Sequence, residues 1–213
     1  MKDVIIVGED PVTRQVIKKL LQETCPDGFS ILREDPLRGS EVKKLTPNYN
    51  ALAASVPVIL LADLDNNNCP PAEQAAWLNN QPKHPNFMFR FAVDEAESWL
   101  LADRNGLADY LGIDATKIPE PSALRPREPH NFEIRPRYKT SLFLMRELAA
   151  ISPKTELKRQ LTPLDNTSKS SEYNLALLPF IDRYWNVKDA LVNSYSLKKM
   201  VLRLQEWCAQ NTN

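Results

Sequence analysis

Apolar residues in the first hundred positions gather in four short runs, and each run is followed by a more polar segment. The runs cover residues 4–7, 29–32, 57–62 and 87–93. β-Branched and aromatic runs without alternation are typical of strands buried on both faces, as in a parallel sheet. The pattern therefore predicts four strands, of which the first and third are buried on both faces.

Helical spacing appears between these runs. Asp10 has the chemistry of a helix N-cap, Pro11 suits the first helical position, and apolar residues then recur at helical spacing, which predicts a helix over residues 11–24. Further helices are predicted over 48–55, over 72–78, and from an Asp94 cap to Leu101. Strands that alternate with helices indicate an α/β fold with a mostly parallel sheet flanked by helices.

The pattern changes after residue 112. Residues 113–137 are rich in proline and predict a loop, and helices are predicted over 138–151, 173–180 and 196–208. We therefore expect an α/β core over residues 1–112. A helical C-terminal subdomain over 113–213 should pack on it.

Glycine is scarce, with 5 residues among 213, whereas proline is abundant, with 17. The glycines form neither a G-x-G pair nor the start of a G-x-x-x-x-G-K-[ST] loop. Both phosphate-binding loops need glycines at fixed spacing so that backbone amides can approach the phosphate. Any phosphate chemistry must therefore use side chains or a metal ion.

Charge and cysteine content narrow the class of protein further. Lysine and arginine total 27, as do aspartate and glutamate, so no overall field points to nucleic acid or a membrane. No apolar run approaches the roughly 18 residues of a membrane span, and the first residues lack the layout of a signal peptide. Cys25, Cys69 and Cys208 lie far apart, which argues against a disulfide framework or a zinc site. These features predict a reduced, cytoplasmic protein.

Carboxylates follow three of the predicted strands. Glu9 comes after the first strand, Asp63 and Asp65 after the third, and Asp94, Glu95 and Glu97 after the fourth. Ligands of parallel sheets bind beyond the carboxyl ends of the strands, and carboxylates that converge need a cation between them. Mg²⁺ or Mn²⁺ would supply that charge.

Simpler roles stay open for several of these acids. Asp10 and Asp94 suit helix caps, and Asp65 suits a turn as well as a metal site. Glu95 and Glu97 would lie about 200° apart on one helix, so one of them could be solvated.

Basic residues gather in the proline-rich segment. Over residues 125–139, five cations face two acids, and the cations are Arg125, Arg127, Arg135, Arg137 and Lys139. This local charge would suit the phosphates of DNA or RNA on either side of a reacting phosphodiester. A solvated loop with ordinary surface charge is the alternative.

Three segments resemble a family of mainly bacterial proteins with a Toprim-like core, related to the Toprim domains of topoisomerases, primases and overcoming-lysogenization-defect nucleases. They are VIIVGE at 4–9, LADLD at 61–65 and FAVDEAESWLLAD at 91–103. The resemblance implies that Glu9 is the first acid and that Asp63 and Asp65 are the metal-binding pair. Glu95 and Glu97 belong to the third segment and are the further expected metal ligands, which makes five carboxylates with Glu9, Asp63 and Asp65. It also implies a metal-dependent nuclease with an ATPase partner in bacterial defence against phage.

The expected activity is therefore cleavage of nucleic acid by a metal-activated water, with Glu9, Asp63, Asp65 and Glu97 as catalytic residues. The sequence also leaves open that the chain forms a homo-oligomer. One alternative is a Toprim-like module that binds an ATPase or nucleic acid without cutting. Another is a receiver-like domain, because residues 7–14 resemble the acidic pocket of a response regulator with Asp63 as phospho-acceptor. The absence of Ser or Thr after the fourth strand departs from the receiver pattern.

Overall fold

The computed structural model describes residues 1–37, 39–65, 69–123, 131–163 and 169–211. The chain divides into two compact units. Unit 1 comprises Met1–Ala92 and Lys199–Asn213, and unit 2 comprises Val93–Lys198. The sequence predicted a boundary after residue 112. The structure instead divides the chain where the fourth strand ends, and it assigns most of the last helix to unit 1.

Unit 1 is built on a parallel sheet of four strands, as predicted. The strands are β1 (Lys2–Gly8), β2 (Phe29–Pro36), β3 (Val58–Asp63) and β4 (Phe87–Ala92), in the order β2-β1-β3-β4. The apolar residues of the central strands β1 and β3 are almost fully buried, which explains their unbroken runs. β2 lies at an edge and continues into charged residues, so it is longer than its apolar run.

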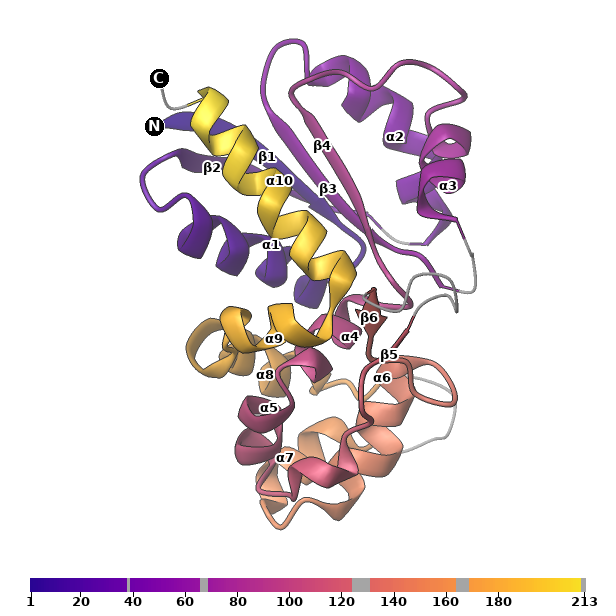
Figure 1. The fold of residues 1–213 in the computed structure, drawn as a ribbon, viewed down its shortest axis with the longest axis vertical. Helices are drawn as coiled ribbons and strands as arrows, with labels where there is room; N and C mark the ends of the chain where they lie inside the picture. The colour runs from indigo at the N-terminus through magenta and orange to yellow at the C-terminus, as the bar shows by residue number, and fades with distance from the viewer. Residues whose placement is uncertain (38, 66–68, 124–130, 164–168, 212–213) are drawn as a thin grey trace. The chain divides into compact units, whose positions relative to one another are not determined.

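Helices cover both faces of this sheet (Figure 1). α1 (Pro11–Thr24) and the unit 1 part of α10 (Tyr195–Asn211) lie on one face, and α2 (Ser40–Leu52) and α3 (Pro70–Trp77) lie on the other. This arrangement follows from right-handed crossovers, because the chain moves outward from β1 to β2 and then back to β3 and β4.

The ends of α1 agree with the sequence, whereas those of α2 do not. α1 begins at Pro11 after the Asp10 cap and ends at Thr24, as predicted. α2 was predicted over 48–55 after an irregular segment, but it is one helix from Ser40 to Leu52 with Pro47 inside it. A proline within a helix normally marks an end, and here tertiary packing overrides that local signal.

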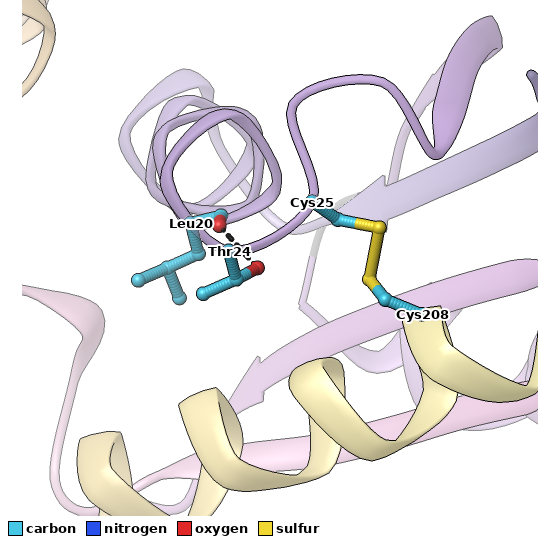
Figure 2. Close-up of a disulfide and its surroundings, with 4 residues drawn as sticks. All are labelled: Leu20, Thr24, Cys25 and Cys208. Carbon is cyan, nitrogen blue, oxygen red and sulfur yellow. Dashed lines mark hydrogen bonds between the residues drawn. A yellow bond between two sulfur atoms is a disulfide. The ribbon is translucent and has the colours of Figure 1, made fainter. Parts of the chain in front are cut away.

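A disulfide joins two distant parts of unit 1. Figure 2 shows Cys25, directly after α1, bonded to Cys208 on α10. Their Cα atoms are 6.1 Å apart although 183 positions separate them in the chain. The prediction that the chain has no disulfide is therefore wrong, because the fold brings together cysteines whose spacing carries no signal. Cys69 is an exposed free thiol.

Next to the disulfide, Phe29 of β2 stacks on Trp207 of α10 with ring centroids 4.8 Å apart. Both rings are largely buried. Aromatic stacking and the covalent bond therefore hold the end of α10 against the same corner of the sheet.

Unit 2 is mainly helical. Its helices are α4 (Ala96–Ala102), α5 (Arg104–Leu111), α6 (Thr140–Phe143), α7 (Thr155–Leu161), α8 (Tyr173–Pro179) and α9 (Val187–Asn193). α6 continues through a π-helical turn (Leu144–Leu148) and a 3₁₀ turn (Ala149–Ile151), so the predicted helix over 138–151 is present. A small hairpin of β5 (Ser122–Ala123) and β6 (Phe132–Glu133) lies within the predicted proline-rich loop.

Two buried tryptophans organise the core of unit 2. Trp99 of α4 donates its indole hydrogen to Ser196 Oγ at 2.7 Å, and Trp185 donates to the Trp99 carbonyl at 3.2 Å. Both side chains are almost fully buried. Each indole therefore has the hydrogen-bond partner that its burial requires.

Within the described residues, none of the helices combines the length and the hydrophobicity needed to cross a bilayer.

Candidate functional site at the strand ends

Two of the predicted acids follow the two central strands of unit 1. Gly8 of β1 is paired in register with Leu61 of β3, so Glu9 and Asp63 both come at the carboxyl ends of neighbouring strands. The strand order reverses between β1 and β3. In open α/β sheets, ligands bind beyond the strand ends at such a switch point. Glu9 and Asp63 are half-buried there.

The first turn of α1 packs closely on the end of β1. A Cβ atom at Gly8 would lie 3.0 Å from Thr13 Cγ2, which is too close for a larger residue without adjustment. Asp10 accepts hydrogen bonds from Thr13 N at 2.8 Å and from Thr13 Oγ1 at 2.9 Å. The predicted cap role of Asp10 is confirmed, and Glu9 directly precedes this cap.

Asp65 is exposed and adopts a left-handed backbone conformation, with φ of 50°. Aspartate tolerates this region better than most residues, and such conformations are common both in turns and at functional sites. The turn role that the sequence left open for Asp65 is supported by its backbone.

The predicted cluster of acids is less compact than expected. Among the described residues, no three His, Cys, Asp or Glu side chains come close enough together to hold a metal ion. Mg²⁺ is commonly held by only one or two carboxylates, with water and substrate oxygens as its other ligands. Glu9 and Asp63 lie at adjacent strand ends, but a site built from five carboxylates is not found among the described residues.

Glu95 is buried in unit 2 and has partners from the start of α6. Only 2% of its side chain is exposed. Its Oε2 accepts a hydrogen bond from Ser141 N at 2.7 Å, and its Oε1 lies 3.1 Å from Lys139 Nζ. Lys139, predicted to contact a phosphate, is thus an ion-pair partner of a predicted metal ligand.

Glu97 on α4 is equally buried, with 1% of its side chain exposed. Its Oε1 accepts hydrogen bonds from Lys169 Nζ at 2.7 Å and from Tyr173 OH at 2.8 Å. Lys169 Nζ also lies 5.0 Å from the centre of the Tyr173 ring. The expectation that Glu95 or Glu97 is solvated is wrong, because Glu95 precedes the helix and both side chains point into protein.

Asp94 is not the cap of α4. Glu95 occupies the N-cap position, and Asp94 has φ of 66°. Asp94 accepts hydrogen bonds from the Thr140 backbone N at 3.0 Å and from the Thr140 hydroxyl. Asp94 and Glu95 together therefore satisfy the first backbone N–H groups of α6, a role that carboxylates favour because of the helix dipole.

The predicted nucleic-acid contacts are only partly described. Arg125 and Arg127 lie outside the described residues. Arg135 is exposed, and Arg137 is paired with Glu147, with 2.5 Å between Nη2 and Oε1. Hydrogen bonds from Tyr138 and Arg137 lower the pKa of Glu147.

Arg135 and Arg137 line a depression of about 670 Å³ in unit 2, together with Lys117. Among the described residues that line it, Glu147 is the one acid, and the lining also includes Phe143 and Leu148. Three cations against one carboxylate leave this surface positively charged. The depression is therefore the described part of the chain that best fits the predicted basic surface.

Sequence reasoning did not find Lys169 and Tyr173. They lie 72 and 76 positions from Glu97, and no motif links them to it. The general rule that buried acids need a cation or several hydrogen bonds would have predicted some partner, though not which one.

The chain was compared with protein-family models, with curated proteins and with solved structures, and none of the three comparisons found a match. The class that the geometry defines is a Rossmann-like α/β fold with a parallel sheet of four strands.

Proposed function

We propose that the protein is a Mg²⁺- or Mn²⁺-dependent phosphodiesterase that acts on nucleic acid. The observation that supports this proposal is the position of Glu9 and Asp63 at the carboxyl ends of the two central strands, on either side of the switch point. The Toprim-like resemblance of the strand-end motifs is the second support.

Glu9 and Asp63 form the proposed site, and Asp65 follows two positions after Asp63. Asp63 would hold the metal, and Glu9 would either bind the metal or accept a proton from the attacking water. When bound, the metal supplies positive charge for the oxygens of the phosphodiester and lowers the pKa of a water. The carboxylates keep that charge at the end of the sheet.

Glu95 and Glu97 are not part of this proposal. Each already has a lysine within ion-pair distance, so neither needs a metal ion to balance its charge. Arg135, Arg137 and Lys117 in unit 2 are proposed contacts for the phosphates of nucleic acid, independently of the acids of unit 1. An ATPase partner and a role in defence against phage follow from the resemblance alone.

The test combines metal binding with cleavage. The protein is titrated with Mn²⁺ under electron paramagnetic resonance and incubated with plasmid DNA, single-stranded DNA and tRNA. We expect Asp63→Asn and Glu9→Gln to weaken Mn²⁺ binding and to lower cleavage by about 100-fold, the scale of losing a group that acts on the transition state. Asp3→Asn is the matched control, because Asp3 is exposed at the opposite end of β1.

Two results would overturn the proposal. One is cleavage that is equal in the wild type and in both variants. The other is a wild-type protein that neither binds Mn²⁺ nor cuts any of the three substrates.

A binding module without catalysis is the second candidate. It is favoured by the lysine partners of Glu95 and Glu97, which leave fewer acids for metal than the sequence predicted. It predicts nucleic-acid binding that persists in EDTA and in Asp63→Asn, with no cleavage at any metal concentration.

The receiver-like alternative shares the strand order, since doubly wound folds of that type also reverse between β1 and β3. It predicts that acetyl phosphate labels Asp63. A chain that stays unlabelled removes this alternative and leaves the phosphodiesterase proposal untouched.

A further inference from the structure

A pocket of about 380 Å³ lies along β4 in unit 1, away from the strand-end acids. Its lining comes from α3, the segment before β4, β4 itself and α10. Its main side chains are Lys83, Met88, Arg90, Arg203, Glu206 and Trp207. This volume lies within the usual range for sites that bind small molecules.

The pocket is strongly positive although the chain as a whole is neutral. Lys83, Arg90 and Arg203 face one carboxylate, Glu206, and Arg203 pairs with that carboxylate at 2.5 Å. Within the described part of the chain, neither Lys83 nor Arg90 has an acidic side chain at ion-pair distance. Lys83 therefore has no acidic partner in that part of the chain, and Arg90 feels the charge of Glu206 only from beyond ion-pair distance.

Arg90 has an unsatisfied donor. Its Nε atom is buried, and none of the described residues accepts a hydrogen bond from it. A buried donor without a partner costs about 1–3 kcal/mol. A ligand oxygen at this position would remove that cost.

The positive charges of the pocket also repel one another. Desolvation lowers the pKa of Lys83, and the charges of Arg90 and Arg203 lower it further. Desolvation and Arg203 likewise lower the pKa of Arg90. Groups that repel one another in a pocket are stabilised when an anion lies between them.

The walls of the pocket are held in place by the edge of the sheet. Lys83 Nζ donates to the Phe87 carbonyl at 2.8 Å, and Gln74 Nε2 donates to the Phe89 carbonyl at 2.6 Å. Trp207 is fixed by its stacking on Phe29. The cations are thus positioned before any ligand arrives, which lowers the entropic cost of binding.

We infer that this pocket binds a small molecule that carries a phosphate group. The cations and the unsatisfied Arg90 Nε suit the phosphate oxygens, because guanidinium groups match phosphate geometry with paired donors. Met88 and Trp207 offer apolar surface to the rest of the molecule. The site is separate from the proposed catalytic acids and does not depend on the proposed activity.

The test is isothermal titration calorimetry in EDTA with pyrophosphate, adenosine monophosphate and adenosine as probes. We expect binding of pyrophosphate or of the monophosphate, and none of adenosine. Arg203→Gln and Arg90→Gln should each weaken binding at least tenfold. Arg203 is more than half exposed on α10, so its replacement leaves the fold intact even if the Arg90 variant is unstable.

Two controls separate this site from the rest of the molecule. Arg33→Gln removes an equal charge from an exposed position on β2 and should leave binding unchanged. Asp63→Asn should also bind normally, which distinguishes failure here from failure of the metal site. The inference is overturned if neither phosphate binds, if adenosine binds equally well, or if Arg203→Gln binds like the wild type. It is also overturned if only an oligonucleotide binds.

Discussion

The two units place their acidic residues in opposite surroundings. In unit 1, Glu9 and Asp63 are half-buried at the ends of strands, on the side of a sheet where ligands bind. In unit 2, Glu95 and Glu97 are buried, and each is paired with a lysine and a further hydrogen-bond donor. In sequence all four look alike, since each follows a buried strand by a few positions.

This difference teaches that position after a strand does not establish what an acid does. A carboxylate at an open strand end can act on a ligand at little cost to folding. A carboxylate buried beside a lysine is mainly a part of the fold, because loss of either partner leaves an uncompensated charge. Three changes to the protein test how the two units differ.

The largest expected effect concerns how unit 1 is held together. Replacement of Cys25 and Cys208 by serine should lower the free energy of unfolding by about 2–5 kcal/mol, because the bond closes a very long loop in the unfolded chain. Hydrogen exchange measured by mass spectrometry should show faster exchange in α1 and α10, with little change in α4 to α9.

Cys69→Ser is the matched control, because Cys69 is exposed and forms no disulfide. If the double serine variant unfolds at the same urea concentration as the control, the disulfide does not contribute to the stability of unit 1 and the prediction is wrong.

The second effect compares the acids directly. Lys169→Met removes the cation beside Glu97 and should cost about 1–3 kcal/mol, since Glu97 stays buried with fewer partners. Asp63→Asn should change the free energy of unfolding by less than about 0.5 kcal/mol. Urea unfolding of both variants measures the contrast.

Lys188→Met serves as the control for charge, because Lys188 is an exposed lysine of the same unit. Equal costs for Lys169→Met and Lys188→Met would show that the Glu97 pair is not structural.

The smallest effect is a pH dependence in unit 2. Burial raises the pKa of Glu133, although hydrogen bonds from Ser196 and Ser194 oppose the shift. The folded state therefore holds this proton more tightly than the unfolded state, so the contribution is favourable below the ordinary pKa of glutamate and is lost as pH rises towards the raised value. The free energy of unfolding should fall with rising pH over that interval.

Glu133→Gln cannot ionise and should show a shallower fall over the same interval. Burial also raises the pKa of Asp103. This makes the free energy of unfolding fall with rising pH in the wild type and in Glu133→Gln alike. An identical slope in the wild type and the variant would contradict the assignment to Glu133.

Much of the fold could be predicted because the relevant signals are local. The apolar runs identify β1, β3 and β4, and Asp10 with Pro11 identifies the start of α1. α2 could not be predicted, because Pro47 lies within it and its packing is not visible locally. The short helices α5, α7 and α9 have too few turns to show a clear period.

The candidate site could be predicted only in part, for a related reason. The strand ends indicate which acids lie at the switch point, since the sheet positions them through backbone register. The partners of Glu95 and Glu97 come from residues 44 to 76 positions further along the chain. Their pairing, like that of Cys25 with Cys208, depends on the finished fold.

Unit 1 is built from two separate stretches of the chain, and this affects the order in which its parts are synthesised. All of residues 93–198 leave the ribosome before residues 199–211, which contribute the last helix of unit 1. Unit 2 is therefore complete in sequence before unit 1 is. Until residues 199–211 are synthesised, one face of the sheet in unit 1 lacks α10, and Cys25 cannot form its disulfide with Cys208. We expect the nascent chain to expose that apolar face until residues 199–211 have been synthesised, which leaves the face open to non-native contacts.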